Sequence, residues 1–320
     1  MRQHNTATGT ITYPDEVCYT FSPLGVRVND SSSSFTQMVV SVYSSTGELF
    51  VKMRLSPYQG SATAQLSGVM QAMFDVSGNK LTYLSATPSP YAKRVRIEIE
   101  YAGASFSFTT LVIWGGAYPY GVRNEKPTTI YRAYGYPLIA TALLRAGESV
   151  AGYTASEVSL VNFPVGDSAT SIDVGGVTVP IEDLPPACGD ACYLRWVDGE
   201  GNVCHYLFEK GKVQYKTKDY GEVISSQPLL PEYENDIYVA SRQQGKTADV
   251  SVELYAALVD KATRGYLSSL LTSAIVDMYD SENDAWIAVD VSAGTTTLTS
   301  LSYDDFVATI NLPASPTQKI

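Results

Sequence analysis

The sequence predicts a mainly β protein, built from antiparallel β-sandwich or barrel domains that each have one short amphipathic helix. Three observations predict this fold class. Apolar and polar residues alternate along much of the chain, turn-forming residues separate the alternating runs, and only two segments show the period of a helix. With 320 residues the chain is long enough for about two domains.

The clearest alternating runs lie in the first third of the chain. Residues 49–55 follow a Ser-Ser-Thr-Gly turn and alternate Leu, Val, Met and Leu with Phe, Lys and Arg. Residues 95–101 alternate Val, Ile, Ile and Tyr with Arg and Glu, and after Ala102-Gly103 the pattern resumes in 106–112. Strands of this kind have one buried and one solvated face. The runs 95–101 and 106–112, separated by a short turn, therefore predict a hairpin.

Two further hairpins are predicted in the second half of the chain. One spans Cys192 to Phe208 around the Asp-Gly-Glu-Gly segment 198–201. The other spans Ile275 to Val291 around the Asp-Ser-Glu-Asn-Asp segment 280–284. Both pair apolar, β-branched or aromatic runs with turn residues between them, which is the usual signature of adjacent antiparallel strands.

Two segments have helical spacing. A stripe of five apolar residues from Leu66 to Phe74 predicts a helix near 61–75, and a weaker stripe from Thr263 to Leu271 predicts one near 260–272, with Asp260 as its N-cap. Residues 115–137 are rich in Gly, Pro and Tyr, and 163–188 contain further turn signals. We place the main boundary near Gly121, which gives an N-terminal domain at 1–121 and a C-terminal domain at 122–320.

The charge balance limits the class of partner. Charged residues make up 17% of the chain, and 22 basic against 33 acidic side chains give a net charge of −11. Because nucleic-acid binding needs clustered Lys and Arg, we expect no nucleic-acid partner. No apolar run reaches the roughly 18 residues that would cross a bilayer, and the first residues have no apolar signal segment, so we expect no membrane partner and folding in the cytoplasm.

Common catalytic devices are missing from the sequence. The chain has two histidines, His4 and His205, and no Gly-x-Ser-x-Gly elbow that could supply a nucleophile for either. It also lacks the Gly-rich motifs that hold nucleotide phosphates. We therefore predict a protein that is not an enzyme and has no cofactor. Paired carboxylates converging from separate strands, as in a glycoside hydrolase, remain an alternative.

Two groups of side chains are candidates for a metal. Cys188, Cys192, Cys204 and His205 are the right residue types for zinc, but strand alternation would turn Cys204 away from Cys192 and His205. We therefore predict buried free thiols, with zinc and a disulfide as alternatives. Residues 280–284 resemble the start of a calcium loop, yet the Gly and the final Glu of that loop are lacking, so a solvated hairpin tip is expected.

Tyrosine is the most informative residue type. The chain has 23 tyrosines, and five of them are close together in the sequence: Tyr118, Tyr120, Tyr131, Tyr134 and Tyr136. Aromatic rings of this kind can anchor a protein interface or stack on sugars. We predict that these five form an interface, with ordinary packing and carbohydrate binding as the alternatives.

Three strings resemble a known group of proteins. The segment from Cys188 to Phe208, with Tyr-Leu-Arg-Trp before its turn and Tyr-Leu-Phe after it, resembles a hairpin of tail-associated structural proteins of phages and prophages of gut bacteria. The Tyr-Arg-Ala-Tyr-Gly-Tyr-Pro segment 131–137 resembles a short element of the same group. Residues 266–273 followed by 284–289 are similar to its C-terminal end.

The resemblance implies a virion component at the distal tail or baseplate, assembled in the host cytoplasm as a homo-oligomeric ring or hub. Its partners would be copies of itself and other tail or baseplate proteins. This agrees with the low charge content, because interfaces are depleted in charge and enriched in Tyr. The alternative function is a carbohydrate-binding β-sandwich or receptor-binding tail module, in which Trp286 or Trp196 would stack on a surface glycan.

Overall fold

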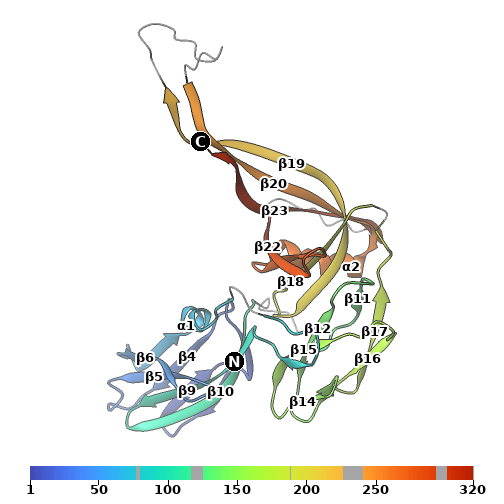
Figure 1. Cartoon of the computed structure of the whole chain (residues 1–320). Helices are drawn as coiled ribbons and strands as arrows, with labels where there is room; N and C mark the ends of the chain where they lie inside the picture. Colours follow the sequence, from blue (N-terminus) through green and yellow to red (C-terminus); the bar gives the residue numbers. More distant parts are fainter. Residues whose placement is uncertain (77–79, 117–124, 188, 226–240, 293–300, 320) are drawn as a thin grey trace, which may run out of the picture. The chain divides into compact units, whose positions relative to one another are not determined.

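The computed structural model describes residues 1–76, 80–116, 125–187, 189–225, 241–292 and 301–319 (Figure 1). Its contacts divide the chain into two compact units. Unit 1 comprises Met1–Pro185 and Trp196–His205, and unit 2 comprises Pro186–Arg195 and Tyr206–Ile320. Strands dominate both units and pair mostly antiparallel, which confirms the predicted mainly β fold class. No helix in the described ranges has the length and apolar character needed to span a membrane.

The first part of unit 1 is a sandwich of two sheets. The four-stranded sheet contains, in spatial order, β1 (Arg2–Asn5), β2 (Gly9–Tyr13), β4 (Gly25–Asp30) and β7 (Ser61–Gln65). The five-stranded sheet contains β3 (Val17–Tyr19), β10 (Ala104–Ile113), β9 (Ala92–Tyr101), β5 (Met38–Ser44) and β6 (Leu49–Leu55). One apolar core takes side chains from both sheets, including Ile11 and Val26 from the first and Val40 and Ile97 from the second.

The predicted strand at 49–55 and the predicted hairpin around Ala102-Gly103 are confirmed. Strands β9 and β10 pair over their whole length, from Tyr101 opposite Ala104 to Ala92 opposite Ile113. Ala102 and Gly103 have φ values of 45° and 78°. Two successive residues in the left-handed region fit the tight turns that match the twist of a hairpin.

The first predicted helix is partly wrong. Residues Ser61–Gln65 form strand β7, and helix α1 is limited to Ser67–Ala72. Ala62 and Ala64 point into the core while Thr63 and Gln65 are exposed, and β7 pairs with β4. Small residues fit either a helix or a strand, so the backbone partner of this segment decides its structure.

A second core in unit 1 contains buried side chains of residues 130–179. Its strands are β11 (Ile130–Arg132), β17 (Val177–Asp183) and β16 (Ser171–Val174) in one sheet, β12 (Ile139–Leu144), β15 (Ser159–Pro164) and β8 (Thr87–Pro88) in another, and the pair β13 (Ser149–Val150) and β14 (Tyr153–Thr154). The predicted boundary at Gly121 lies outside the described residues.

Unit 2 is built on a closed barrel with the strand order β18-β19-β20-β23-β22-β21. The strands are β18 (Ala191–Val197), β19 (Val203–Ser225), β20 (Ser241–Asp260), β21 (Val276–Asp280), β22 (Ala285–Val291) and β23 (Tyr303–Lys319). Both predicted hairpins are therefore confirmed, although β19 runs far beyond Phe208. Leu254, Phe306 and Ile310 are among the buried side chains of the barrel.

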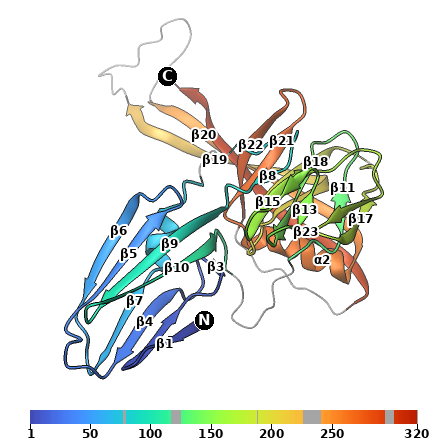
Figure 2. The ribbon, with the colours of Figure 1, turned by 90° about the horizontal axis from the view of Figure 1, so that it is seen from below.

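The second predicted helix is confirmed. Helix α2 (Lys261–Ser268) continues as a 3-10 helix at Ser269–Thr272. The Asp260 side chain accepts a hydrogen bond from the backbone N–H of Thr263 at 2.7 Å, which is the N-cap contact expected of an aspartate. Figure 2 shows α2 within unit 2.

Candidate functional site

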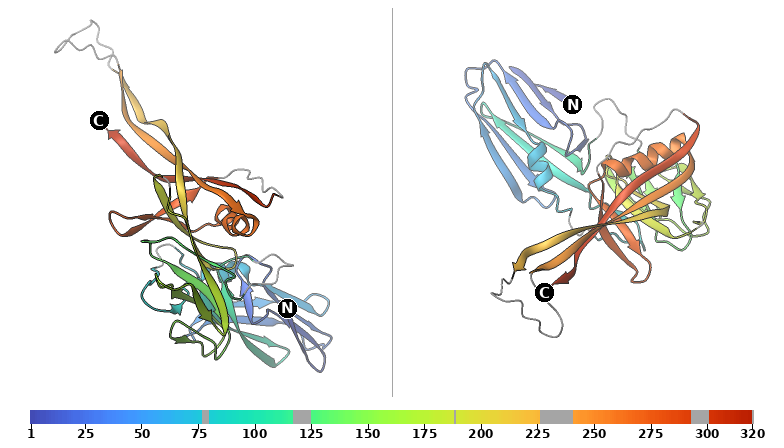
Figure 3. Two further views of the ribbon diagram at one scale, coloured as in Figure 1. Left: turned by 90° about the vertical axis from the view of Figure 1, so that its right-hand side faces the viewer. Right: turned by 90° about the horizontal axis from the view of Figure 1, so that it is seen from above.

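Three strands of unit 2 continue beyond the barrel as a narrow sheet. Strand β20 pairs with β19 out to Ser225 opposite Ser241 and with β23 out to Lys319 opposite Gly245. We call residues 210–225, 241–252 and 311–319 of these strands the arm (Figures 1 and 3). Every β19 side chain from residue 210 to residue 223 is exposed. The arm is thus a strand-paired surface that its own barrel does not cover.

The register of the arm sorts its side chains onto two faces. Directly paired residues of an antiparallel sheet lie on the same face, and successive residues lie on opposite faces. The pairs Val213 with Val252 and Tyr215 with Val250 lie on one side, which we call the apolar face. The intervening pairs, Gln214 with Ser251 and Lys216 with Asp249, lie on the other side, which we call the polar face.

The apolar face is a row of side chains that is buried at the barrel and exposed further out along the arm. Ile310, paired with Val252, is fully buried, and Val252 itself is buried. Further out along the arm, Val213 is 48% exposed and Tyr215 is 71% exposed. An apolar row that begins in a core and ends uncovered is typical of a surface that a partner buries.

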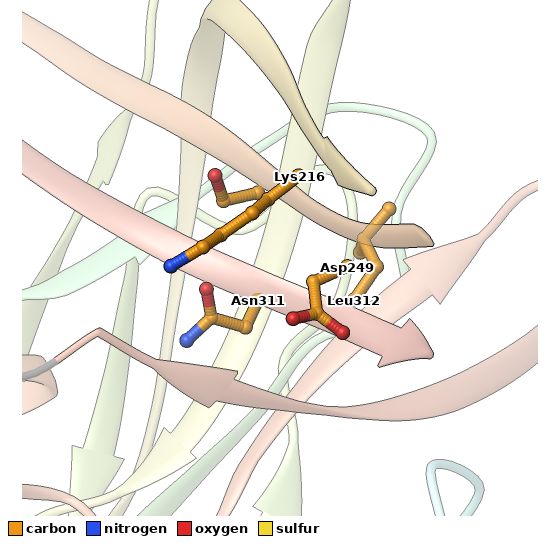
Figure 4. A pocket seen from close by; sticks show the side chains of 5 residues that line it. Lys216, Asp249, Asn311 and Leu312 are labelled. Atoms are coloured by element: carbon orange, nitrogen blue, oxygen red, sulfur yellow. The ribbon is translucent and has the colours of Figure 1, made fainter. Parts of the chain in front are cut away.

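The polar face contains a hollow of about 400 Å³, lined by Lys216, Asp249, Ser251, Asn311 and Leu312. Figure 4 shows Lys216, Asp249 and Asn311 around this hollow. Lys218 forms an ion pair with Asp249, with 2.5 Å between Nζ and Oδ2, and the Ser292 hydroxyl lies 3.0 Å from Asn311 Oδ1. The hollow offers hydrogen-bond donors, acceptors and a cation, which suits contact with a polar protein surface.

The edges of the arm are protected against strand pairing. Asn311 at the base of the arm pairs with Asp290 of β22, and beyond it β20 is central in the described arm, with β19 and β23 as the edge strands. Strand β19 has four lysines at 210–218 and register shifts between Lys210 and Val213 and between Tyr220 and Val223. Strand β23 contains Pro313 and Pro316. Lysines, prolines and bulges are the usual means of blocking edge-to-edge association, so the faces of the arm are the surfaces available for contact.

The five predicted interface tyrosines have different environments. Tyr118 and Tyr120 lie outside the described residues. Tyr131 is buried in unit 1 and does not present its ring at the surface. Tyr134 is 62% exposed, and Tyr136 is half-buried. The interface role stays a prediction for Tyr134 and Tyr136.

Exposed Tyr134 belongs to a polar cluster around a buried arginine. The Arg132 guanidinium donates to Asp183 Oδ1 at 2.6 Å and to the carbonyls of Gly166 and Ala169, each at 2.8 Å. Tyr134 donates its hydroxyl proton to Asp183 at 3.1 Å. The Arg132 hydrogen bond lowers the pKa of Asp183, so this carboxylate is charged at neutral pH. The cluster joins the ends of β11 and β17 to the segment that contains Gly166 and Ala169, and it is a structural feature of unit 1.

The two tryptophans proposed as sugar platforms also differ. Trp196 is buried on β18, so its assignment as an exposed stacking platform is wrong. Trp286 is half-buried on β22. The Arg195 guanidinium lies 4.2 Å from the centroid of the Trp286 ring and donates to Asp277 at 2.8 Å. One side of the Trp286 ring is therefore already covered by a cation.

Cys18, Cys192 and Cys204 are buried free thiols, as predicted for Cys192 and Cys204, and Cys188 lies outside the described residues. Burial raises the pKa of Cys18 to about 11 and that of Cys192 to about 12. A thiolate is the form that binds metal, so these two environments oppose ligation. Among the described residues no three His, Cys, Asp or Glu side chains are grouped so as to hold a metal ion.

The acidic hairpin tip is held by its own hydrogen bonds. Asp280 accepts from the Glu282 backbone N–H at 3.0 Å and from the Asn283 side chain at 2.7 Å, and these bonds lower its pKa. Tyr279 donates to Asp284 at 2.7 Å. These hydrogen bonds define the conformation of the charged turn.

The comparisons with known proteins give no family for the chain. No protein-family model matches it, and no curated protein matches its sequence. Among solved structures, the chain is similar to extracellular domains 3–5 of Drosophila OTK, with 8% sequence identity over 74% of this chain and 88% of that one. The TM-score of 0.18 is too low for this likeness to support an argument about function.

Sequence reasoning missed the arm. Its signal is present, because Val213 and Tyr215 in one segment and Val250, Val252 and Leu254 in another follow the alternation of paired strands. In the structure, lysines and apolar residues alternate along β19 in the first of these segments.

Proposed function

We propose that this chain is a non-enzymatic structural protein of a phage tail or tail-like particle, which acts in the virion as a subunit of a ring or hub. The observation that supports the proposal most directly is the exposed apolar face of the arm. Val213 and Tyr215 continue the apolar row that begins in the barrel core, and they are 48% and 71% exposed in the structure. The resemblance of residues 188–208, 131–137, 266–273 and 284–289 to tail-associated proteins supplies the class of particle that we propose.

The mechanism is mechanical and involves no bond-making step. A sheet that projects from a closed barrel can insert between neighbouring subunits, where burial of its apolar face provides affinity. The protected edges of the arm prevent uncontrolled strand addition, so association depends on matched faces. Permanent contacts of this type suit the low charge content of the chain, at 17% charged residues.

The proposal is tested by the mass of the purified full-length protein, measured by light scattering after size exclusion and by electron microscopy. We expect a discrete oligomer for the wild-type chain and a shift to monomer for the double variant Val213→Ser with Tyr215→Ser. The matched control is Tyr58→Ser, because Tyr58 is 77% exposed but lies in unit 1 outside the arm. A wild-type chain that stays monomeric at high concentration and does not join tail particles would contradict the proposal.

A glycan-binding role is the second candidate. It is favoured by the half-buried Trp286, whose ring lies 5.1 Å from that of Tyr279 on the neighbouring strand. Aromatic pairs of this kind can supply a stacking surface for a sugar ring. A glycan array with the wild-type chain and with Trp286→Ala separates the candidates: specific hits lost in the variant would favour this role, and an empty array would favour the structural one.

A further inference from the structure

The hairpin formed by β21 and β22 has a charge opposite to that of the arm. Residues 276–291 contain five carboxylates and no basic side chain, whereas residues 210–218 of β19 contain four lysines and no acidic side chain. Asp277 is paired with Arg195, but Glu282 and Asp284 at the tip are exposed. The chain as a whole has a net charge of −11, so the lysine segment is a local exception.

The arm and this hairpin leave the barrel of unit 2 in different directions (Figures 2 and 3). Strand β22 joins β23 at Asp290 opposite Asn311 and Val291 opposite Ile310, which lies at the base of the arm. From that junction the tip at residues 281–284 and the outer arm diverge. The acidic tip therefore points away from the outer arm of its own chain.

We infer that the polar face of the arm docks the acidic β21–β22 turn of a second copy of this chain, with Glu282 and Asp284 entering the hollow beside Lys216. This inference rests on the proposed function and deepens it by naming the partner surface. Lys218 already pairs with Asp249, which neutralises the carboxylate that lines the hollow. Lys216 then supplies the cation, and the Ser251 hydroxyl and the Asn311 amide supply hydrogen-bond donors for incoming carboxylates.

The turn is suited to dock without reorganisation. Asp280 fixes the backbone at Glu282, and Tyr279 fixes the Asp284 side chain. Groups that are held before binding lose less conformational freedom on association. Because the two contacting surfaces are different, each copy uses its arm toward one neighbour and its turn toward the other. A head-to-tail contact of this kind generates a ring if the rotation closes and a fibre if it does not.

The test uses charge reversal in the full-length protein, with assembly measured by sedimentation velocity. Lys216→Glu alone and Glu282→Lys alone should each weaken self-association about tenfold or more, because like charges then face each other. Mixing the two variants in equal amounts should restore assembly, since each copy then offers the charge that its neighbour needs. Lys52→Glu and Glu48→Lys are matched controls, because both residues are exposed in unit 1, and they should leave assembly unchanged.

A second measurement locates the contact directly. Carbodiimide, which joins an amine to a carboxylate in contact with it, should link Lys216 to Glu282 or Asp284 between isotope-labelled and unlabelled wild-type copies. Wild-type oligomers without this link, whose assembly both reversals leave unchanged, would overturn the docking while leaving the proposed oligomeric function in place. Wild-type chains that remain monomeric would overturn both.

Discussion

Two long antiparallel hairpins of this protein have similar sequence patterns and opposite surroundings. Strands β9 and β10 alternate apolar and polar residues, and Val95, Ile97 and Ile99 are fully buried under the second sheet of the sandwich. Strands β19 and β20 alternate in the same way in the arm, yet Tyr215 is largely exposed. Alternation therefore predicts a strand with one apolar face, and the tertiary structure decides what covers that face.

The two hairpins differ in what buries their apolar faces, and this difference indicates where a partner would bind. In β9 the apolar face is covered by residues of the same chain, so its contribution is to the stability of unit 1. In the arm the apolar face adds nothing comparable until another surface covers it. The same residue types thus serve folding in one hairpin and, in our proposal, association in the other.

The largest loss of stability should come from truncating a buried side chain on the apolar face of β9. Ile97→Ala should lower the free energy of unfolding of unit 1 by about 2–5 kcal/mol, because a fully buried isoleucine leaves a cavity in the sandwich core. Urea unfolding, followed by circular dichroism at a concentration where the protein is monomeric, measures the change.

The matched variant in the arm is Tyr215→Ala. Because the ring is mostly exposed in the single chain, we expect the unfolding free energy to change by no more than about 0.5 kcal/mol, with self-association reduced. Equal losses of unfolding free energy in Ile97→Ala and Tyr215→Ala would contradict the view that only the first hairpin buries its apolar face within the chain.

Much of the fold could be predicted because local patterns determine it. The β9–β10 and β21–β22 hairpins follow from alternation with turn residues between the runs, and α2 follows from its apolar stripe and the Asp260 cap. Strand β7 could not be separated from helix α1, because alanines at 62 and 64 fit a strand face as well as a helix stripe. Its pairing with β4 is a long-range contact that no local window contains.

The candidate site was much harder to predict. The tyrosine cluster drew attention by its density, but density says nothing about exposure, and Tyr131 is buried. The exposed pair Val213 and Tyr215 is separated from its partners Val250 and Val252 by more than thirty residues of sequence. Only the register of the sheet shows that these four side chains share one face.

A smaller loss of stability is expected at alkaline pH near the β9–β10 hairpin. Cys18 on β3 is packed beside Thr110 of β10, and burial raises its pKa from 9.0 to about 11. The folded state keeps the thiol proton between these values while the unfolded state loses it, so stability should fall as pH rises from about 9 toward 11.

Cys18→Ser is the control for this pH dependence, since a serine hydroxyl does not titrate and can still bond to Thr110. The difference in unfolding free energy between wild type and Cys18→Ser should change by at most about 1.4 kcal/mol for each unit of pKa difference. A pH profile with the same slope in both proteins would show that the thiol does not contribute. Cys192 is unchanged in the pair, so its own titration cancels.

A moderate loss of stability is expected at the inner end of β20, whose outer end forms the arm. Asp260 ends this strand and caps α2 through the Thr263 backbone N–H. Asp260→Ala should cost about 1 kcal/mol of stability in unit 2 because one N–H of the first turn loses its acceptor, and Asp260→Asn, which still accepts that bond, should recover most of it. Thermal unfolding measures both variants, and self-association should be unaffected because the cap lies in the folded barrel region and not on a face of the arm. If Asp260→Ala weakened assembly as strongly as Tyr215→Ala, the two ends of β20 would not have separate roles. The proposed contrast, in which the barrel buries its own apolar side chains and the arm needs a partner to bury them, would then be wrong.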